Sequence, residues 1–460
     1  MFKRIAFILL LLLGTAPLLA APEIPYLKPV RKEDRILILA PHPDDEAIGC
    51  AGIIQQAVAA GAQVGVAYLT NGDHNEVAFI VHEKHPAIFQ RQFINMGEKR
   101  KREAVKAMQL LGLKEDNLIF LGYPDFGTFA IFSQYWQPKE PYMSLLTRIS
   151  SVPYKDNLSF GAPYVGQSIL ADLKKMLLKF RPNKIFVSHP ADVNLDHKTF
   201  YLFLQVALSD LSKDIPEPEV YPYLIHCVGW PLPRHFHPAL SLGPPDKFRH
   251  SPIQWRKLNL DARQVERKRK AILCYASQTN CCAFYLLSFA RRNELFGDYP
   301  EAKVRREGSI KERGRSFFGF AQMFRDADVG ILGGLEGLGE ERPGVSYGAA
   351  DNSILIRVEK REEMVSRFNL QVYLFGYSHK TDFAGMPKIH IAAKSRNFRV
   401  FANGKMITPD GVFVILKPKA YILGVPLEIL GNPDFVLTSM KVYGGTAQAA
   451  SIGAQKVEIE

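Results

Sequence analysis

The strongest constraint on the fold is the regular alternation of short apolar runs with amphipathic segments in the first half of the chain. Apolar runs typical of buried strands lie at Arg35–Ala40, Val64–Leu69, Leu118–Leu121 and Lys184–Ser188. Segments with helical periodicity separate them, at Ala47–Ala60, Arg100–Leu111 and Gln167–Phe180. This order predicts βαβ units, and therefore an α/β fold with a Rossmann-like, mostly parallel sheet and flanking helices.

The last hundred residues follow a different pattern. Short alternating runs such as Leu370–Phe375 and Val436–Val442 are separated by turn signals, of which Asn403-Gly404 is the clearest hairpin turn. This spacing predicts a small C-terminal antiparallel β-sandwich. Between the two parts, five glycines between positions 330 and 339 indicate a junction.

The first residues have the plan of a secretory signal peptide. Lys3 and Arg4 precede the uninterrupted apolar run Ile5–Leu13, and small residues follow at Ala20–Ala21. The run is short for a bilayer span, although Leu18 departs from the usual cleavage site and leaves an uncleaved anchor as the alternative. We therefore expect an exported protein, periplasmic or extracellular. The expected organisation is a signal peptide (1–21), an α/β domain (32–305), a Gly-rich junction (306–351) and a β-rich domain (352–460).

Composition and charge narrow the classes of partner. The chain has 460 residues, of which 47% are hydrophobic and 23% charged, so a disordered chain is excluded. The formal net charge of +12 favours anionic surroundings. Because the basic residues are scattered and no base-reading motif is present, we expect no nucleic-acid partner. Peripheral association with an anionic envelope surface is the expected consequence of the charge.

Chemically competent side chains follow two of the predicted strands. Pro41-His42-Pro43-Asp44-Asp45-Glu46 comes directly after the first, and His189-Pro190-Ala191-Asp192-Val193-Asn194-Leu195-Asp196-His197 comes after the fourth. Ligands bind beyond the carboxyl ends of the strands in such sheets. Two histidines and a carboxylate with an open position form a common catalytic zinc set, and an unligated carboxylate beside it can accept a proton from water. Helix capping would explain one such cluster alone, but two clusters favour a metal site.

These motifs resemble the PIG-L/LmbE-type zinc-dependent N-deacetylases, which remove acyl groups from the amide nitrogen of N-acylglucosamine-type sugars. The segment from His42 to Glu46 and the later pair Asp196-His197 carry the resemblance. Weaker matches, Thr70-Asn71-Gly72-Asp73, Arg100-Lys101-Arg102-Glu103 and Leu121-Gly122-Tyr123-Pro124-Asp125, extend it over roughly residues 35–299. The resemblance implies that His42, Asp45 and His197 bind Zn²⁺ and that Asp44 is the general base.

Other residues are assigned by resemblance with open alternatives. Some members of the family have a histidine three residues before the last ligand to stabilise the oxyanion, but this chain has Asn194, which donates through its amide. His189 either supplies an imidazole or caps the strand end. Arg100 and Asp125 match positions that face sugar hydroxyls, and a helix-surface ion pair and a turn aspartate are the alternatives. Asp196 either orients the last histidine or caps the following helix.

Two further segments contain histidines. His74, His82 and His85 lie in a loop of about twenty-five residues that forms either a polar lid or an extra metal site. The segment from Tyr223 to Pro231 interleaves aromatic and polar residues, as either a wall of a sugar site or a core strand.

The sequence thus predicts an exported metal-dependent hydrolase that removes the N-acetyl group from an N-acetylglucosamine-type sugar in an envelope glycan, glycolipid or exopolysaccharide. The C-terminal sandwich would bind carbohydrate or a surface. One alternative is an amidase for a longer N-acyl or conjugated amino sugar, and another is a non-catalytic glycan-binding protein. The intact set of His42, Asp44, Asp45 and His197 favours an enzyme, because a binder needs no unligated base.

Overall fold

The computed structural model describes residues 23–74, 89–248, 251–307, 344–350, 352–359, 368–394, 397–417, 420–444 and 447–460. The expected signal peptide, His82, His85 and the glycine cluster lie outside the described residues.

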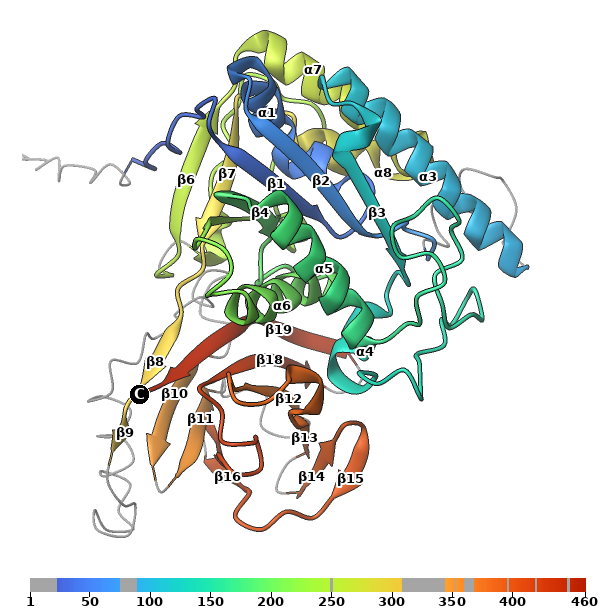
Figure 1. Cartoon of the computed structure of the whole chain (residues 1–460). Coiled ribbons are helices and arrows are strands. Elements are labelled where there is room, and N and C mark those ends of the chain that lie inside the picture. Colours follow the sequence, from blue (N-terminus) through green and yellow to red (C-terminus); the bar gives the residue numbers. More distant parts are fainter. Residues whose placement is uncertain are drawn as a thin grey trace, which may run out of the picture.

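A seven-stranded sheet forms the centre of the first part (Figure 1). Its order is β3 (Leu118–Tyr123), β2 (Gln63–Thr70), β1 (Arg35–Ala40), β4 (Lys184–Ser188), β5 (Glu219–Tyr223), β7 (Asn293–Asp298) and β6 (Gln254–Asn259). The first five strands are parallel, and β7 is antiparallel to both of its neighbours. The predicted α/β fold with a mostly parallel sheet is confirmed.

Helices cover both faces of this sheet. One face carries α1 (Asp45–Ala60), α3 (Gln90–Leu110), α7 (Ala262–Leu273) and α8 (Ala276–Leu286), and the other carries α4 (Thr128–Gln134), α5 (Gly166–Phe180) and α6 (Leu195–Asp210). Short 3₁₀ turns occupy Glu115–Asn117, Asp246–Phe248, Leu287–Phe289 and Phe383–Gly385. Helix α3 begins ten residues before its predicted start, because its buried face there contains Phe93 and Met96 but continues with Gly97 and Arg100, which interrupt the apolar periodicity.

The central position of β1 in the sheet explains why its sequence after Arg35 is apolar. Ile36 and Ile38 pack into the core on the side of α1, whereas Leu37 and Leu39 pack into the core on the side of α6. All four are fully buried, as expected for a central strand covered on both faces. The chain runs outward from β1 to β3 and then crosses to β4 on the other side of β1, so the loops after β1 and β4 diverge and leave a crevice between them.

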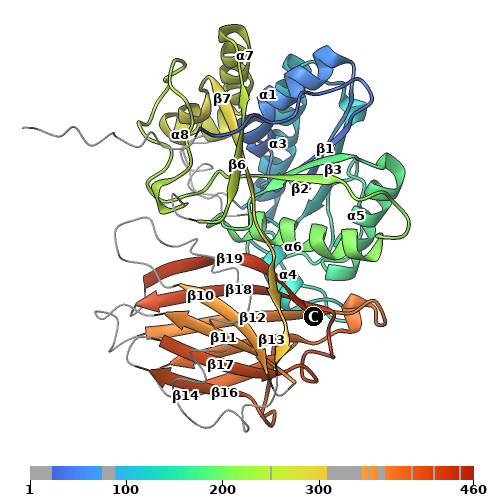
Figure 2. The same ribbon diagram turned by 90° about the vertical axis from the view of Figure 1, so that its left-hand side faces the viewer.

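The C-terminal part is a sandwich of two sheets (Figure 2). The smaller sheet contains β16 (Phe413–Lys417), β17 (Ala420–Pro426), β11 (Ser353–Glu359), β10 (Val345–Ala350) and β9 (Arg306–Glu307). The larger contains β15 (Lys405–Ile407), β14 (Asn397–Ala402), β13 (Lys388–Lys394), β12 (Phe368–Tyr377), β18 (Phe435–Gly444), β19 (Ala447–Ile459) and β8 (Ala302–Val304). Asn403 and Gly404 have φ of 49° and 77° and form the two-residue hairpin turn that the sequence predicts.

The strands of the sandwich start earlier than expected. β8 pairs with β19 and β9 pairs with β10, in both cases in parallel, so the sandwich includes residues before position 352. Its larger sheet also packs on α4 and α6, where Phe375 and Leu437 share one core with Phe132 and Phe203. No helix among the described residues is long and apolar enough to cross a membrane.

Candidate active site

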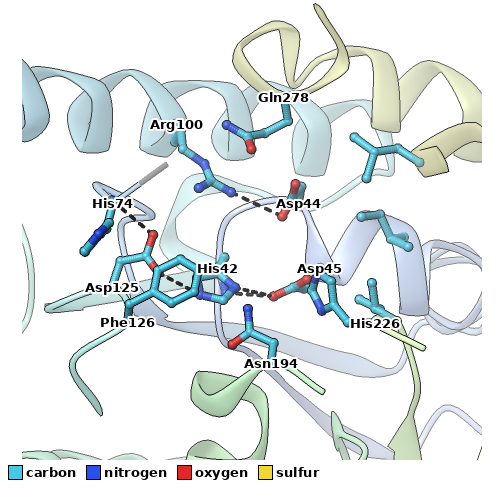
Figure 3. A pocket seen from close by; sticks show the side chains of 13 residues that line it. His42, Asp44, Asp45, His74, Arg100, Asp125, Phe126, Asn194, His226 and Gln278 are labelled. Carbon is cyan, nitrogen blue, oxygen red and sulfur yellow. Dashed lines mark hydrogen bonds and ion pairs between the residues drawn. The ribbon is translucent and has the colours of Figure 1, made fainter. Parts of the chain in front are cut away.

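The loops after β1 and β4 meet at a pocket of about 360 Å³, at the crevice where the strand order diverges (Figure 3). Its polar lining includes His42, Asp44, Asp45, Arg100, Asn194 and His226. The two clusters that the sequence singled out are therefore brought together, and a third element, the segment after β5, joins them.

Three buried side chains converge on one point. His42 Nδ1 lies 3.2 Å from Asp45 Oδ2, and His197 Nε2 lies 3.2 Å from the same oxygen. One ligand atom from each of the three lies within 4.8 Å of the others. His197 is fully buried, and the neighbours of its ring nitrogens among the described residues are carboxylates, Asp45 at Nε2 and Asp192 at Nδ1, which suits an imidazole that binds a metal. The chemistry of this donor set fits a zinc-type ion.

A carboxylate faces the far nitrogen of each imidazole. His42 Nε2 lies 3.1 Å from Asp125 Oδ1 and 3.4 Å from Asp196 Oδ2, and His197 Nδ1 lies 3.2 Å from Asp192 Oδ2. Such carboxylates orient metal-binding histidines and raise their basicity. The expectation that Asp196 orients His197 is wrong, because consecutive residues of a helix point in different directions and Asp192 fills that place.

Two other groups could also hold an ion by distance alone, but their aspartates Asp192 and Asp196 accept more backbone N–H groups than Asp45, which accepts that of His42 at 2.9 Å. One contains Asp192 with His197 and His226, and the other contains Asp196 with His42 and Asp125. Asp192 accepts hydrogen bonds from three backbone N–H groups, and Asp196 accepts the N–H groups of residues 126 and 128. The group of His42, Asp45 and His197 is therefore the best candidate.

Asp44 lies beside this group with an unusual backbone. Its φ of 129° and ψ of −28° are rarely adopted by a residue with a side chain. Glu46 holds it there, since Glu46 Oε2 accepts the Asp44 N–H at 3.1 Å while Oε1 accepts the Tyr275 hydroxyl. Burial raises the pKa of Asp44 to about 6 despite the guanidinium of Arg100, which lies 3.3 Å from Oδ1. The pocket thus holds a carboxylate suited to proton transfer near neutral pH.

The electrostatics of the pocket favour a cation. Burial lowers the pKa of His197, but the carboxylates of Asp192 and Asp45 outweigh it and raise the pKa to about 10. Burial also lowers the pKa of His42, but the nearby carboxylates, Asp125 above all, outweigh it and hold the pKa well above its ordinary value. A bound dication would replace the protons that these carboxylates otherwise stabilise.

Arg100 and Asp125 both line the pocket, as the sequence suggested. Arg100 is buried rather than part of a helix-surface ion pair, and it donates to the carbonyl oxygens of Gly72 at 3.0 Å and Pro43 at 2.8 Å. Asp125 Oδ2 accepts the N–H of His74 at 3.1 Å. Both residues therefore fix the loops around the pocket, and their contact with a sugar stays a prediction.

His189 lies outside the pocket. It is fully buried, its ring stacks on Trp255 at 5.6 Å, and its Nδ1 accepts the N–H of Ala191 at 3.0 Å. Burial lowers the pKa of His189 to about 3. This corrects the expectation that His189 supplies an imidazole to the site and matches its alternative, a cap of the strand end.

Asn194 and His226 do line the pocket. Asn194 Oδ1 accepts the N–H of Asp196 at 2.9 Å and caps α6, and its amide nitrogen points toward His42 and Asp45 in Figure 3. His226, whose side chain is 34% exposed, has its Nδ1 3.3 Å from Asp192 Oδ1. The sequence singled out the segment from Tyr223 to Pro231 as either a wall of a sugar site or a core strand, and its residues Ile225 and His226 line the pocket directly after β5.

Comparisons with known proteins find one matching family model and several similar solved structures. Residues 37–208 match the family model described as PIG-L: GlcNAc-PI de-N-acetylase. A comparison with curated proteins finds no match. Solved structures that are similar include N,N'-diacetylchitobiose deacetylase from Pyrococcus horikoshii (18% identity, 57% of this chain and 82% of that chain covered, TM-score 0.33). The A40926 pseudoaglycone deacetylase has 16% identity, with 58% of this chain and 96% of that chain covered and a TM-score of 0.36. The 4-carboxy-2-hydroxymuconate hydratase GalB from Pseudomonas putida KT2440 has 15% identity, with 58% of this chain and 97% of that chain covered and a TM-score of 0.37.

Proposed function

Residues 37–208 form a PIG-L family domain, and from this premise we propose that the chain is a zinc-dependent N-deacetylase of an N-acetylglucosamine-type sugar. The observation that carries the proposal is the position of Asp44, a buried carboxylate beside the group of His42, Asp45 and His197 but not part of it. A protein that only binds a glycan would need no such base.

The ion would be held by His42, Asp45 and His197, with both imidazoles oriented by the carboxylates behind them. When bound, zinc supplies Lewis acidity to the acyl carbonyl. The protein's contribution is to hold three ligands in a buried cluster and to leave the remaining side of the cluster open to the pocket.

The reaction adds water to the carbonyl carbon, breaks its bond to nitrogen, and releases acetate and the amine. Asp44 Oδ1 faces Arg100, so Oδ2 is the oxygen that accepts the proton of the attacking water and returns it to the leaving nitrogen. The amide of Asn194 donates to the carbonyl oxygen as negative charge develops there. The imidazole of His226 lines the same pocket.

The substrate is proposed to be part of an envelope glycan, glycolipid or exopolysaccharide. This rests on the signal-peptide pattern of residues 1–21 and on the formal net charge of +12, which favours anionic polymers. Sequencing the N-terminus of the secreted protein tests it. A mature chain that retains Lys3 and Arg4 in the cytoplasmic fraction would contradict it.

The test of the activity combines metal analysis with acetate release from N-acetylglucosamine oligomers. We expect about one zinc per chain, with activity lost to a chelator and restored by zinc. Asp44→Asn should retain the metal and lose the base, which is worth about 10²–10⁴-fold in rate. Asp116→Asn, at an exposed carboxylate, is the control and should leave both unchanged. Full turnover by Asp44→Asn would refute the role of Asp44, and a folded protein that binds no metal would refute the site.

A further inference from the structure

Phe126 is an exposed aromatic residue at the edge of the pocket. It lines the pocket, yet 55% of its surface is exposed, whereas its neighbour Asp125 is 3% exposed. It belongs to none of the apolar cores of the described residues. Its ring therefore contributes little to the packing of these cores and is open to a ligand in the pocket.

The backbone of Phe126 is held in an unfavourable conformation. Its φ of 57° lies in the left-handed region, which is a clear outlier for a bulky side chain. Asp196 fixes this turn, because its Oδ2 accepts the Phe126 N–H at 2.7 Å and its Oδ1 accepts the Thr128 N–H at 3.3 Å. A strained residue that is firmly anchored at a pocket indicates a functional constraint on where its side chain points.

A second ring extends this apolar surface. The imidazole of His74 lies 5.2 Å from the Phe126 ring, at 58° to it, and the His74 N–H is bound by Asp125. Figure 3 shows His74, Asp125 and Phe126 on one side of the pocket, with Asp44 and Asp45 across from them. The two rings, which we call the aromatic platform, thus border the reacting centre without being part of it.

We propose that the aromatic platform of Phe126 and His74 binds the sugar unit attached to the N-acetylated one, so that the enzyme acts on oligosaccharides or polymers. The inference rests on the proposed deacetylase function. The pocket of about 360 Å³ is near the lower end of the range for ligand sites, so it accommodates one sugar ring. A linked unit lies at the rim of the pocket, where Phe126 is 55% exposed and the apolar C–H face of a sugar ring can pack on its aromatic face and be removed from water.

The test compares the N-acetylglucosamine monosaccharide with its trimer. Phe126→Ala should raise KM for the trimer about tenfold with little change in kcat, and should raise KM for the monosaccharide by clearly less. Phe126→Trp should restore the KM for the trimer. Phe160→Ala is the matched control, because Phe160 is 54% exposed but lies outside the pocket lining. Melting temperatures of all variants establish that each one is folded.

A readout that needs no turnover separates this inference from the proposed function. In a variant that combines Phe126→Trp with Asp44→Asn, binding of the trimer should change the fluorescence of the new tryptophan, with Asp44→Asn alone as the background. If the wild type releases no acetate from either sugar but the fluorescence changes, the proposed function fails and the platform stands. No fluorescence change, or an equal KM change for monosaccharide and trimer, overturns the platform.

Discussion

Replacing Asp192 by asparagine tests whether the orientation of the metal-binding histidine depends on a residue that itself contacts neither substrate nor metal. Asp192 is fully buried, and its two oxygens accept the N–H groups of Asn194, Ile225 and His226 at 2.8–3.2 Å. The same carboxylate faces Nδ1 of both His197 and His226, at 3.2 and 3.3 Å. Although burial raises the pKa of Asp192, these two imidazoles hold it well below its ordinary value, so the group is ionised.

The magnitude follows from these contacts. The substitution Asp192→Asn keeps one oxygen acceptor and replaces the other with an NH₂ group, which leaves at least one buried donor without a partner and lowers the free energy of unfolding by about 1–3 kcal/mol. Loss of the charge behind His197 should weaken zinc binding by about 10–100-fold, or about 1.4–2.7 kcal/mol.

Zinc affinity is measured by competition with a chromophoric chelator, and stability by urea unfolding of the metal-free protein. Asp34→Asn is the matched control, since Asp34 is also buried and accepts from Lys184 Nζ at 2.6 Å, but at the opposite end of β1. It should lose stability without losing zinc affinity. Unchanged zinc affinity in the Asp192 variant, or an equal loss in both variants, would refute the reasoning.

Two further predictions concern the fold. Gly49→Ala would place a Cβ 2.5 Å from the buried ring of Tyr223 and should lower the free energy of unfolding by about 1–3 kcal/mol. The control is Gly243→Ala, whose Cβ meets nothing within 4 Å and which should leave the free energy of unfolding unchanged. Equal urea midpoints for the two variants would contradict this prediction. Burial lowers the pKa of Lys388 to about 7, so between pH 7 and 10 the unfolded chain binds a proton that the folded chain does not. The free energy of unfolding of the wild type should therefore rise with pH more steeply than that of Lys388→Met, by up to about 1.4 kcal/mol per pH unit. Parallel curves of unfolding free energy against pH for the two proteins would refute the prediction.

The sequence predicts those parts of the site whose positions follow from residues close together in the chain. β1 and β4 have the bounds that their apolar runs indicated, and the residues directly after them reach the same pocket because parallel strands end at the same edge of the sheet. His42 and Asp45 lie three residues apart, so one turn brings them together. No tertiary information was needed for these positions.

The missing parts depend on contacts between distant segments. β5 contains Pro222 and is only five residues long, so it shows no apolar run. The sequence therefore left open whether the segment from Tyr223 to Pro231 forms a wall of the site or a core strand, and the tertiary structure brings its His226 to the pocket. The pairing of Asp192 rather than Asp196 with His197 depends on how the loop before α6 turns. His189 follows its strand as expected but points into the aromatic packing around Trp255 instead of the pocket.

Backbone strain and buried acids are linked in this pocket. Asp44 and Phe126 both have positive φ, which costs about 1–3 kcal/mol each, and in both cases a buried carboxyl group accepts the N–H of the strained residue. Glu46 does so for the proposed base and Asp196 for the proposed platform, and Asp196 also lies 3.4 Å from a ring nitrogen of His42. A hydrogen bond of this kind offsets part of the strain. The surplus of acidic residues around the pocket is therefore explained by two tasks, in which some acids attract a cation and others hold the reacting and sugar-binding side chains in conformations that they would not adopt alone.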